Sequence, residues 1–518
     1  MSRWDYTRKK YVNWLSETDL RKEFSKKIKF ENLSLWWLSD LMSKDNINES
    51  EWYIDLNKKL NHKKNKHQKR RCNYFYLFIN LLKKIILKVI SYIFINIFFS
   101  NKKDILPKRD CYYGLYTNFV NHNGQFIDRQ YGRLTTKNKN SKIYIIELPE
   151  NFFLIKNIFK IKKNLRKVPL NYIISNKELK FFDILKIFGC CYQSLLMTIK
   201  ILKKKNYFFI NKINCKDILE KKLINSFFGP IQDQLLKAKA LQCSLNKISV
   251  TNFINCYDFY PQARAFYYFS KKTEVKNIVN VNHAIYFKND LNYGFNSNDF
   301  SKSKSSFFSP KPDYFFSQGL KYYKKLRKTF GNKNVFCTGS LKVELNKFIL
   351  KSKINRKSKN LKKKTILLLC GINDYNAFIH ILNQCKLDNW KILVAPHPLK
   401  KNNTIRSFRE KLKIDFTNVS LQKKEKLFSK CDYIICGNAI LGYELAIRNY
   451  NVLRVCHKDF IPTFDINNEV PTAKNKREFL KLISKSKISQ KSKFIEKNYF
   501  YKYDMKTSNR IEKILENL

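Results

Sequence analysis

Short apolar runs that end at small or polar residues recur along the second half of the chain. One covers 365–371, a second 390–396 and a third 431–436, and a helix-like segment at 439–448 follows the third. Strands that alternate with helices predict a parallel sheet. Ligands of such sheets bind beyond the carboxyl ends of the strands, so a binding crevice is expected where these runs end.

The first half alternates in the same way. β-branched or aromatic runs that stop at polar residues predict strands, and longer apolar segments between them predict helices. The predicted strands are 112–117, 143–148, 250–255, 275–281, 310–316 and 335–340, and the predicted helices are 179–202, 230–241 and 322–330. The pattern therefore predicts an α/β protein of two Rossmann-like domains that face a cleft.

A lysine-rich segment separates the two halves. Residues 351–364 hold seven lysines and one arginine and no apolar period, which is typical of an interdomain linker. The predicted units are an aromatic-rich helical cap (1–62), a basic run with an amphipathic helix (63–104), an N-terminal acceptor domain (105–350), the linker (351–364), a C-terminal donor-nucleotide domain (365–490) and a helical tail (491–518).

The N-terminal extension carries two unusual patterns. Five of the six tryptophans lie in 1–62, where we expect a helical cap packed on the next domain, with substrate stacking or membrane-interface contact as the alternative. A basic run at 63–71 precedes an apolar stretch at 74–99 whose polar residues share one helical stripe. This pattern favours a helix lying in the membrane interface, with a spanning helix and a core helix as alternatives.

Composition narrows the class of protein and its setting. The 518 residues are 44% hydrophobic, which excludes disorder throughout, and 102 Lys+Arg against 41 Asp+Glu give a net charge of +61. Such a surface attracts anionic lipid, nucleic acid or phosphorylated substrates alike. The 13 cysteines form no zinc pattern and no apolar leader opens the chain, so a cytoplasmic protein is expected.

Strand ends supply the candidate residues of the second domain. His397 and Pro398 end one strand, and the imidazole could donate to a phosphate oxygen or merely fill the strand end. Gly437 and Asn438 precede a helix whose amides could bind an anion, although a tight turn needs the same residues. The remaining donor-site candidates are Gly371, Asn373 and Glu444, the last of which could equally be a surface residue.

The first domain supplies the other wall of the predicted cleft. Gly339, Ser340 and Lys342 follow its last strand. Asp258 and His283 follow two earlier strands and are the candidates for removing a proton from an acceptor hydroxyl, with capping of a helix or turn as the alternative.

Several short motifs together resemble a known family. They are Trp36-Trp37-Leu-Ser-Asp-Leu41, Asn255-Cys-Tyr-Asp258, Asn282-His283-Ala, Pro310-x-Pro-Asp-Tyr-Phe315, Thr338-Gly-Ser-Leu-Lys342, His397-Pro398 and Tyr443-Glu444. This set resembles bacterial surface carbohydrate biosynthesis proteins. The C-terminal half is more distantly similar to the GT-B glycosyltransferases of capsule synthesis (sialyl-, polysialyl- and Kdo-transferases) and to the glycerophosphotransferases of teichoic acid synthesis.

The resemblance implies a GT-B-like fold and a nucleotide-activated donor. Those enzymes hold the phosphate of a cytidine-nucleotide donor with a His-Pro pair, which maps onto His397 and Pro398. Their Ser/Thr pair is replaced here by Gly437-Asn438-Ala439, and their acidic-acidic-Gly base motif has no match, which leaves Asp258 on position alone.

The resemblance also implies the partners. We expect a metal-independent glycosyltransferase without a bound cofactor that uses a nucleotide-sugar donor, CMP-linked by this resemblance, and a glycan or glycolipid acceptor of lipopolysaccharide or capsule. It would lie on the anionic inner face of the plasma membrane and bind no specific nucleic acid. The alternatives are a non-catalytic scaffold and a basic nucleic-acid-binding protein.

Overall fold

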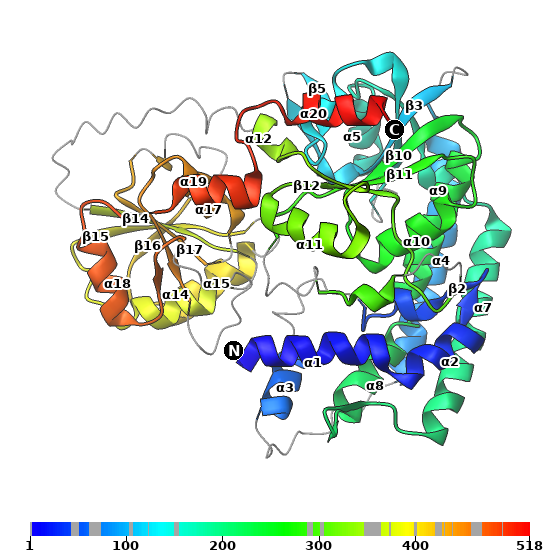
Figure 1. The fold of residues 1–518 in the computed structure, drawn as a ribbon, viewed down its shortest axis with the longest axis horizontal. Coiled ribbons are helices and arrows are strands. Elements are labelled where there is room, and N and C mark those ends of the chain that lie inside the picture. The colour runs from blue at the N-terminus through cyan, green and yellow to red at the C-terminus, as the bar shows by residue number, and fades with distance from the viewer. Residues whose placement is uncertain are drawn as a thin grey trace.

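Two all-parallel sheets form the core of the computed structural model (Figure 1). The first has the order β13-β12-β11-β10-β3-β6-β7 and the second the order β16-β15-β14-β17-β18-β19. The structure describes residues 3–42, 51–61, 74–102, 107–122, 124–149, 155–286, 294–300, 305–345, 364–371, 374–397, 401–419, 427–428, 430–437, 439–456, 469–488 and 490–518.

The first sheet contains the strands of the first half of the chain. Its strands are β3 (Lys108–Leu115), β6 (Lys142–Glu147), β7 (Asn171–Ile174), β10 (Val250–Asn255), β11 (Asn277–Val281), β12 (Tyr314–Ser317) and β13 (Val335–Cys337). Its helices are α5 (Ile155–Leu165), α6 (Ser175–Glu178), α7 (Phe181–Lys204), α8 (Lys216–Asn225), α9 (Pro230–Leu245), α10 (Pro261–Ser270), α11 (Leu320–Phe330) and α12 (Leu341–Leu345). The strand and helix predictions listed above are confirmed within a few residues at each end.

The second sheet is built on the most apolar run of the chain. Its strands are β14 (Lys364–Leu369), β15 (Trp390–Ala395), β16 (Phe416–Asn418), β17 (Tyr433–Cys436), β18 (Val452–Val455) and β19 (Thr472–Ala473), with α14 (Tyr375–Leu382), α15 (Lys401–Lys411), α17 (Ile440–Ile447) and α18 (Lys476–Ile483) around them. β14 lies between β15 and β17 and is buried on both faces, which explains its unbroken run of leucines. Residues 351–363 of the predicted linker lie outside the described residues. Its last residue, Lys364, is the first residue of β14.

The N-terminal segment packs on the first domain. It comprises α1 (Arg3–Glu17), α2 (Asp19–Lys27), the hairpin β1–β2 (Lys29–Phe30 and Leu33–Ser34) and α3 (Glu51–Asn61). Trp36 and Trp37 are fully buried in the same apolar cluster as strand residues of the first sheet. These two indoles are therefore core residues, and neither is free to stack on a substrate.

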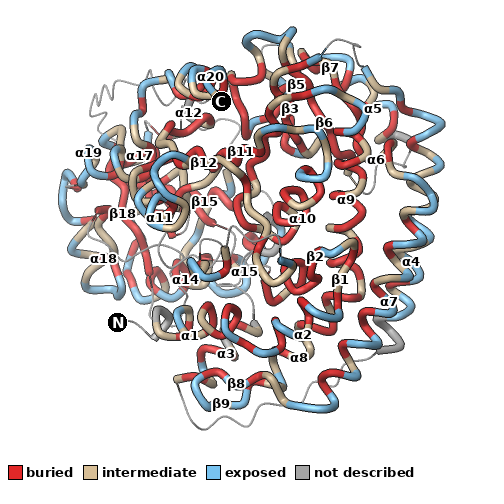
Figure 2. The backbone as a smooth tube through the Cα atoms, turned by 45° about the vertical axis from the view of Figure 1, so that its right-hand side comes forward, coloured by how far each residue is buried: buried red, intermediate tan, exposed pale blue. Residues whose placement is uncertain are grey.

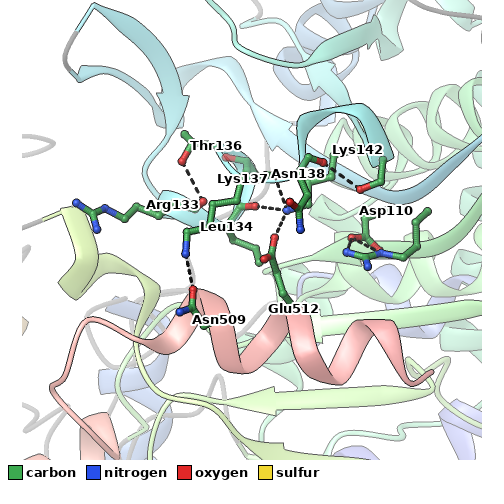
Figure 3. Close-up of polar contacts among 12 residues, drawn as sticks. Asp110, Arg133, Leu134, Thr136, Lys137, Asn138, Lys142, Asn509 and Glu512 are labelled. Carbon is green, nitrogen blue, oxygen red and sulfur yellow. Dashed lines mark hydrogen bonds and ion pairs between the residues drawn. The ribbon is translucent and has the colours of Figure 1, made fainter.

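The end of the chain returns to the first domain. α19 (Ser492–Ile495) packs on α17, whereas α20 (Thr507–Glu516) lies on the first domain, where it is drawn in red (Figure 1). Lys142 of β6 is fully buried and donates to the carbonyls of Leu134 (2.7 Å) and Lys137 (2.8 Å) and to Glu512 of α20 (Figure 3). The predicted helical tail thus holds the two domains together.

The C-terminal segment packs closely against two glycines of the first domain. A Cβ on Gly319 would lie 2.4 Å from the carbonyl oxygen of Asn498, and one on Gly339 would lie 2.7 Å from Oγ1 of Thr507. Gly339 also has a φ of +103°, which favours glycine. Close packing against the C-terminal segment therefore explains why both positions are glycine.

Candidate functional site

The loop after β11 of the first domain packs against the ends of strands of the second sheet. Ile285 follows that strand in the first domain, yet it is buried in one apolar cluster with Leu369, Cys436 and Tyr443 of the second domain. His283 lies two residues before Ile285. The structure therefore places His283 where the two domains meet.

Two cations of the first domain act on His283. Lys342 opens α12 directly after the β13 loop, and Arg129 follows the hairpin β4–β5 (Phe119–His122 and Gln125–Asp128), which leaves the carboxyl end of β3. Electrostatic repulsion from both cations, after burial, lowers the pKa of His283 to about 3. The imidazole is therefore neutral near pH 7, and no described residue bonds its Nδ1.

The second domain adds two groups to the same region. Burial, and after it the charge of Arg129, lowers the pKa of His397 at the end of β15. Glu444 of α17 acts on Lys342 as an opposite charge, although burial and Arg129 together keep the lysine pKa below its usual value. We call Asp128, Arg129, His283, Lys342, His397 and Glu444 the cleft cluster.

Lys342 has no close counter-ion in the described part of the chain, since no carboxylate there lies within ion-pair distance of its ammonium. The charges of Lys342 and Arg129, together with the imidazoles of His283 and His397, make a site that suits an anion. The first amides of α17 lie at the carboxyl end of β17, and its N-cap Ala439 makes no side-chain cap hydrogen bond. These amides add donors of the kind that bind phosphate.

Asp128 of the cleft cluster ends β5, in the hairpin that precedes Arg129. It is fully buried, and its Oδ1 accepts a hydrogen bond from the Gln130 amide (2.7 Å). Oδ2 has no partner among the described residues and would lie 2.7 Å from a Cβ on Gly114. Burial raises the pKa of Asp128 to about 7, so the group exchanges a proton in the physiological range.

Asp258 occupies a different environment. It is buried, and its Oδ2 accepts from Asn282 Nδ2 (3.1 Å) while its backbone carbonyl accepts from the Tyr267 hydroxyl (2.6 Å). Its φ of +48° is a left-handed conformation that aspartate tolerates better than most residues. These bonds tie together the loops after β10 and β11, and the general-base role of Asp258 stays a prediction.

Gly371 and Gly437 share one partner. The Gly371 amide donates to both carboxylate oxygens of Asp374 (2.8 and 2.9 Å), and a Cβ on Gly437 would lie 2.3 Å from Asp374 Oδ2. Asp374 therefore ties together the ends of β14 and β17. The other candidates of this edge, Asn373, Pro398 and Asn438, lie outside the described residues.

The predicted site residues thus fall into two groups. Electrostatic interactions connect His283 and Glu444 with Lys342, and His397 with Arg129, whereas Asp258 and Gly339 are engaged elsewhere and Ser340 is buried. Asp128 and Arg129 join the site without having been predicted. No group of three or more His, Cys, Asp or Glu side chains in the described ranges is placed to hold a metal ion.

Comparison with known proteins adds distant structural likenesses. No family model matches the chain, and no curated protein matches its sequence. Among solved structures it is similar to the wall teichoic acid polymerase TagF (12% identity, TM-score 0.39, covering 86% of this chain and 98% of that one). It is also similar to the UDP-N-acetylglucosamine 2-epimerase from Rickettsia bellii (11%, 0.40, 79% and 96%) and to S. aureus MnaA in a co-structure with UDP (12%, 0.41, 80% and 96%). At these values the chemistry of the site rests on its own residues.

Proposed function

We propose that this protein is a glycosyltransferase-like enzyme of surface polysaccharide synthesis. It would transfer a sugar from a nucleotide-activated donor to a glycan or glycolipid acceptor. The observation that carries the proposal is the cleft cluster, in which the cations Arg129 and Lys342 accompany the imidazoles of His283 and His397. These groups are of the kind that bind a nucleotide phosphate. A cytidine nucleotide is the first donor to test, and lipopolysaccharide and capsule are the first products.

In the proposed reaction, Lys342, Arg129 and His397 bind the donor phosphates. The acceptor hydroxyl oxygen attacks the anomeric carbon, the bond from that carbon to the phosphate oxygen breaks, and its electron pair leaves with the nucleotide. The hydroxyl proton passes to His283 Nδ1, which has no partner among the described residues. Positive groups that await the leaving phosphate stabilise the charge that develops there.

Donor binding would also prepare His283 for this step. The charges of Lys342 and Arg129 contribute to the low pKa of the imidazole, and a bound phosphate would offset them. The pKa of His283 would then rise toward its ordinary value, where it accepts a proton more readily. The proposal uses the protein's own cations and no bound cofactor, and the nucleotide sugar is a substrate.

A thermal-shift panel of cytidine, uridine and guanosine mono- and diphosphates tests the proposal. We expect the nucleotides of one of these bases to raise the melting temperature of the wild-type protein. The His397→Ala variant should lose most of that increase. Sugar transfer should fall at least a hundredfold in His283→Gln with nucleotide binding retained. A protein that binds no nucleotide in the panel would instead fit a non-catalytic scaffold.

A further inference from the structure

One flank of the first domain exposes an apolar helix face. The helix α4 (Tyr74–Phe98) turns its polar stripe inward, where Lys88 pairs with Asp233 of α9 (3.0 Å) and Lys84 lies against Gly229. Its opposite face is exposed and apolar, and carries Phe78, Ile79, Leu82, Ile86, Ile93 and Ile97. Ile97 is 67% exposed. Two lysines of α4 thus lie against the protein, whereas Lys83 and Asn96 are exposed beside the apolar side chains.

A second helix extends the same flank. α7 touches α4 through Tyr92 and Phe181, whose ring centroids are 6.5 Å apart, and both helices run along one side of the molecule (Figure 2). Its exposed apolar side chains are Phe181, Phe182, Leu185, Tyr192, Leu196 and Met197, with Phe182 at 79% exposure. Lys162 of α5 lies 5.7 Å from the ring of Phe98, which brings the exposed Phe159 to the same edge. We call these residues of α4, α7 and α5 the apolar flank.

The charged residues of α4 and α7 are almost all lysines. α4 contains no acidic residue and α7 contains only Asp183, whereas Lys83, Lys200, Lys203 and Lys204 are exposed. A second copy of a chain with a net charge of +61 would bring like charge to this surface. An anionic bilayer brings the complementary charge together with an apolar interior.

We propose that the apolar flank docks the protein onto an anionic lipid bilayer, with α4 and α7 lying in the plane of the interface. α7 is long and apolar enough to span a membrane by length and composition. Its inner face, however, contributes Ile184, Ile187 and Cys191 to the core of the first domain. Both helices are therefore held flat against the protein and can insert only their outer side chains, while the lysines reach the headgroups.

The test is co-sedimentation of the full-length protein with vesicles of phosphatidylcholine that contain 30% phosphatidylglycerol, at near-physiological salt. Ile86→Glu on α4 and Leu196→Glu on α7 each place a charge where an apolar side chain would insert. We expect each variant to lower the partition coefficient at least tenfold and the pair to lower it further. Phe494→Glu, at another exposed apolar position, on α19 beside the second domain, is the control and should bind like the wild type.

Three results would overturn the proposal. One is binding of both variants at the wild-type level, and another is equal binding of the wild type to vesicles of phosphatidylcholine alone. The third is a dimer in sedimentation velocity that Ile86→Glu or Leu196→Glu dissociates, because a second copy would then cover the flank. None of these outcomes depends on the chemistry proposed for the cleft, since the variants lie outside the cleft cluster.

Discussion

The charge of Arg129 in the first domain adds to burial in lowering the pKa of His397 in the second domain. Arg129 and His397 lie far apart in the sequence. The relationship exists only because the carboxyl ends of β3 and β15 approach from different domains.

Removing the charge of Arg129 should change His397 in a predictable direction. We expect Arg129→Gln to raise the pKa of His397, because one of its two causes of lowering is gone, and to weaken nucleotide binding about tenfold. Imidazole resonances followed by NMR through a pH titration measure the first effect. Arg166→Gln, which removes an exposed arginine of the first domain outside the cleft cluster, should change neither quantity.

Asp128 should make stability fall as pH rises. Its pKa is about 7 in the folded protein and about 4 in the unfolded chain, so the folded state binds more protons between these values. This contribution is complete below about pH 4 and is lost as pH rises through 7. Asp128→Asn should therefore gain at least about 1 kcal/mol at pH 8 relative to its gain at pH 5, since one pKa unit corresponds to about 1.4 kcal/mol. Urea denaturation at the two pH values checks this, and an equal effect at both would refute the protonation of Asp128.

The close approach of Gly437 to Asp374 predicts a local stability effect. Gly437→Ala would drive a Cβ to 2.3 Å from Asp374 Oδ2 and disturb the bonds to the Gly371 amide. We expect a loss of about 1–3 kcal/mol, the usual cost of overpacking. Gly189→Ala on α7 is the control, because its Cβ would meet nothing within 4 Å, and it should be neutral or slightly stabilising. Thermal denaturation of both variants measures these stability changes.

The buried ammonium of Lys142 should fix the returning helix α20. Lys142→Met leaves Glu512 and two carbonyls without their donor, which costs about 3 kcal/mol for a broken buried pair. Hydrogen exchange should accelerate in α20 more than in the second sheet. A double variant with Glu512→Gln should lose less than the sum of the two single losses, and additive losses would contradict the pairing.

The strands were predictable because their signal is local. Runs such as 365–371 are apolar over their whole length, and that pattern identifies a strand buried on both faces. The hairpin β4–β5 mixes polar and apolar residues, so no pattern indicated that it would bring Asp128 and Arg129 to the site. The return of α20 and the pairing of Asp258 with Asn282 depend on contacts between distant segments, which periodicity cannot reveal.

In the proposed mechanism, Arg129 and Lys342 hold a nucleotide phosphate between the domains. Isothermal titration calorimetry of the wild type and of Lys342→Met with the nucleoside diphosphate selected by the thermal-shift panel tests it most directly. We predict micromolar binding for the wild type, at least tenfold weaker binding for the variant, and unchanged binding for Lys200→Met, which removes a lysine from the apolar flank. Equal affinity of the wild type and Lys342→Met would contradict the account.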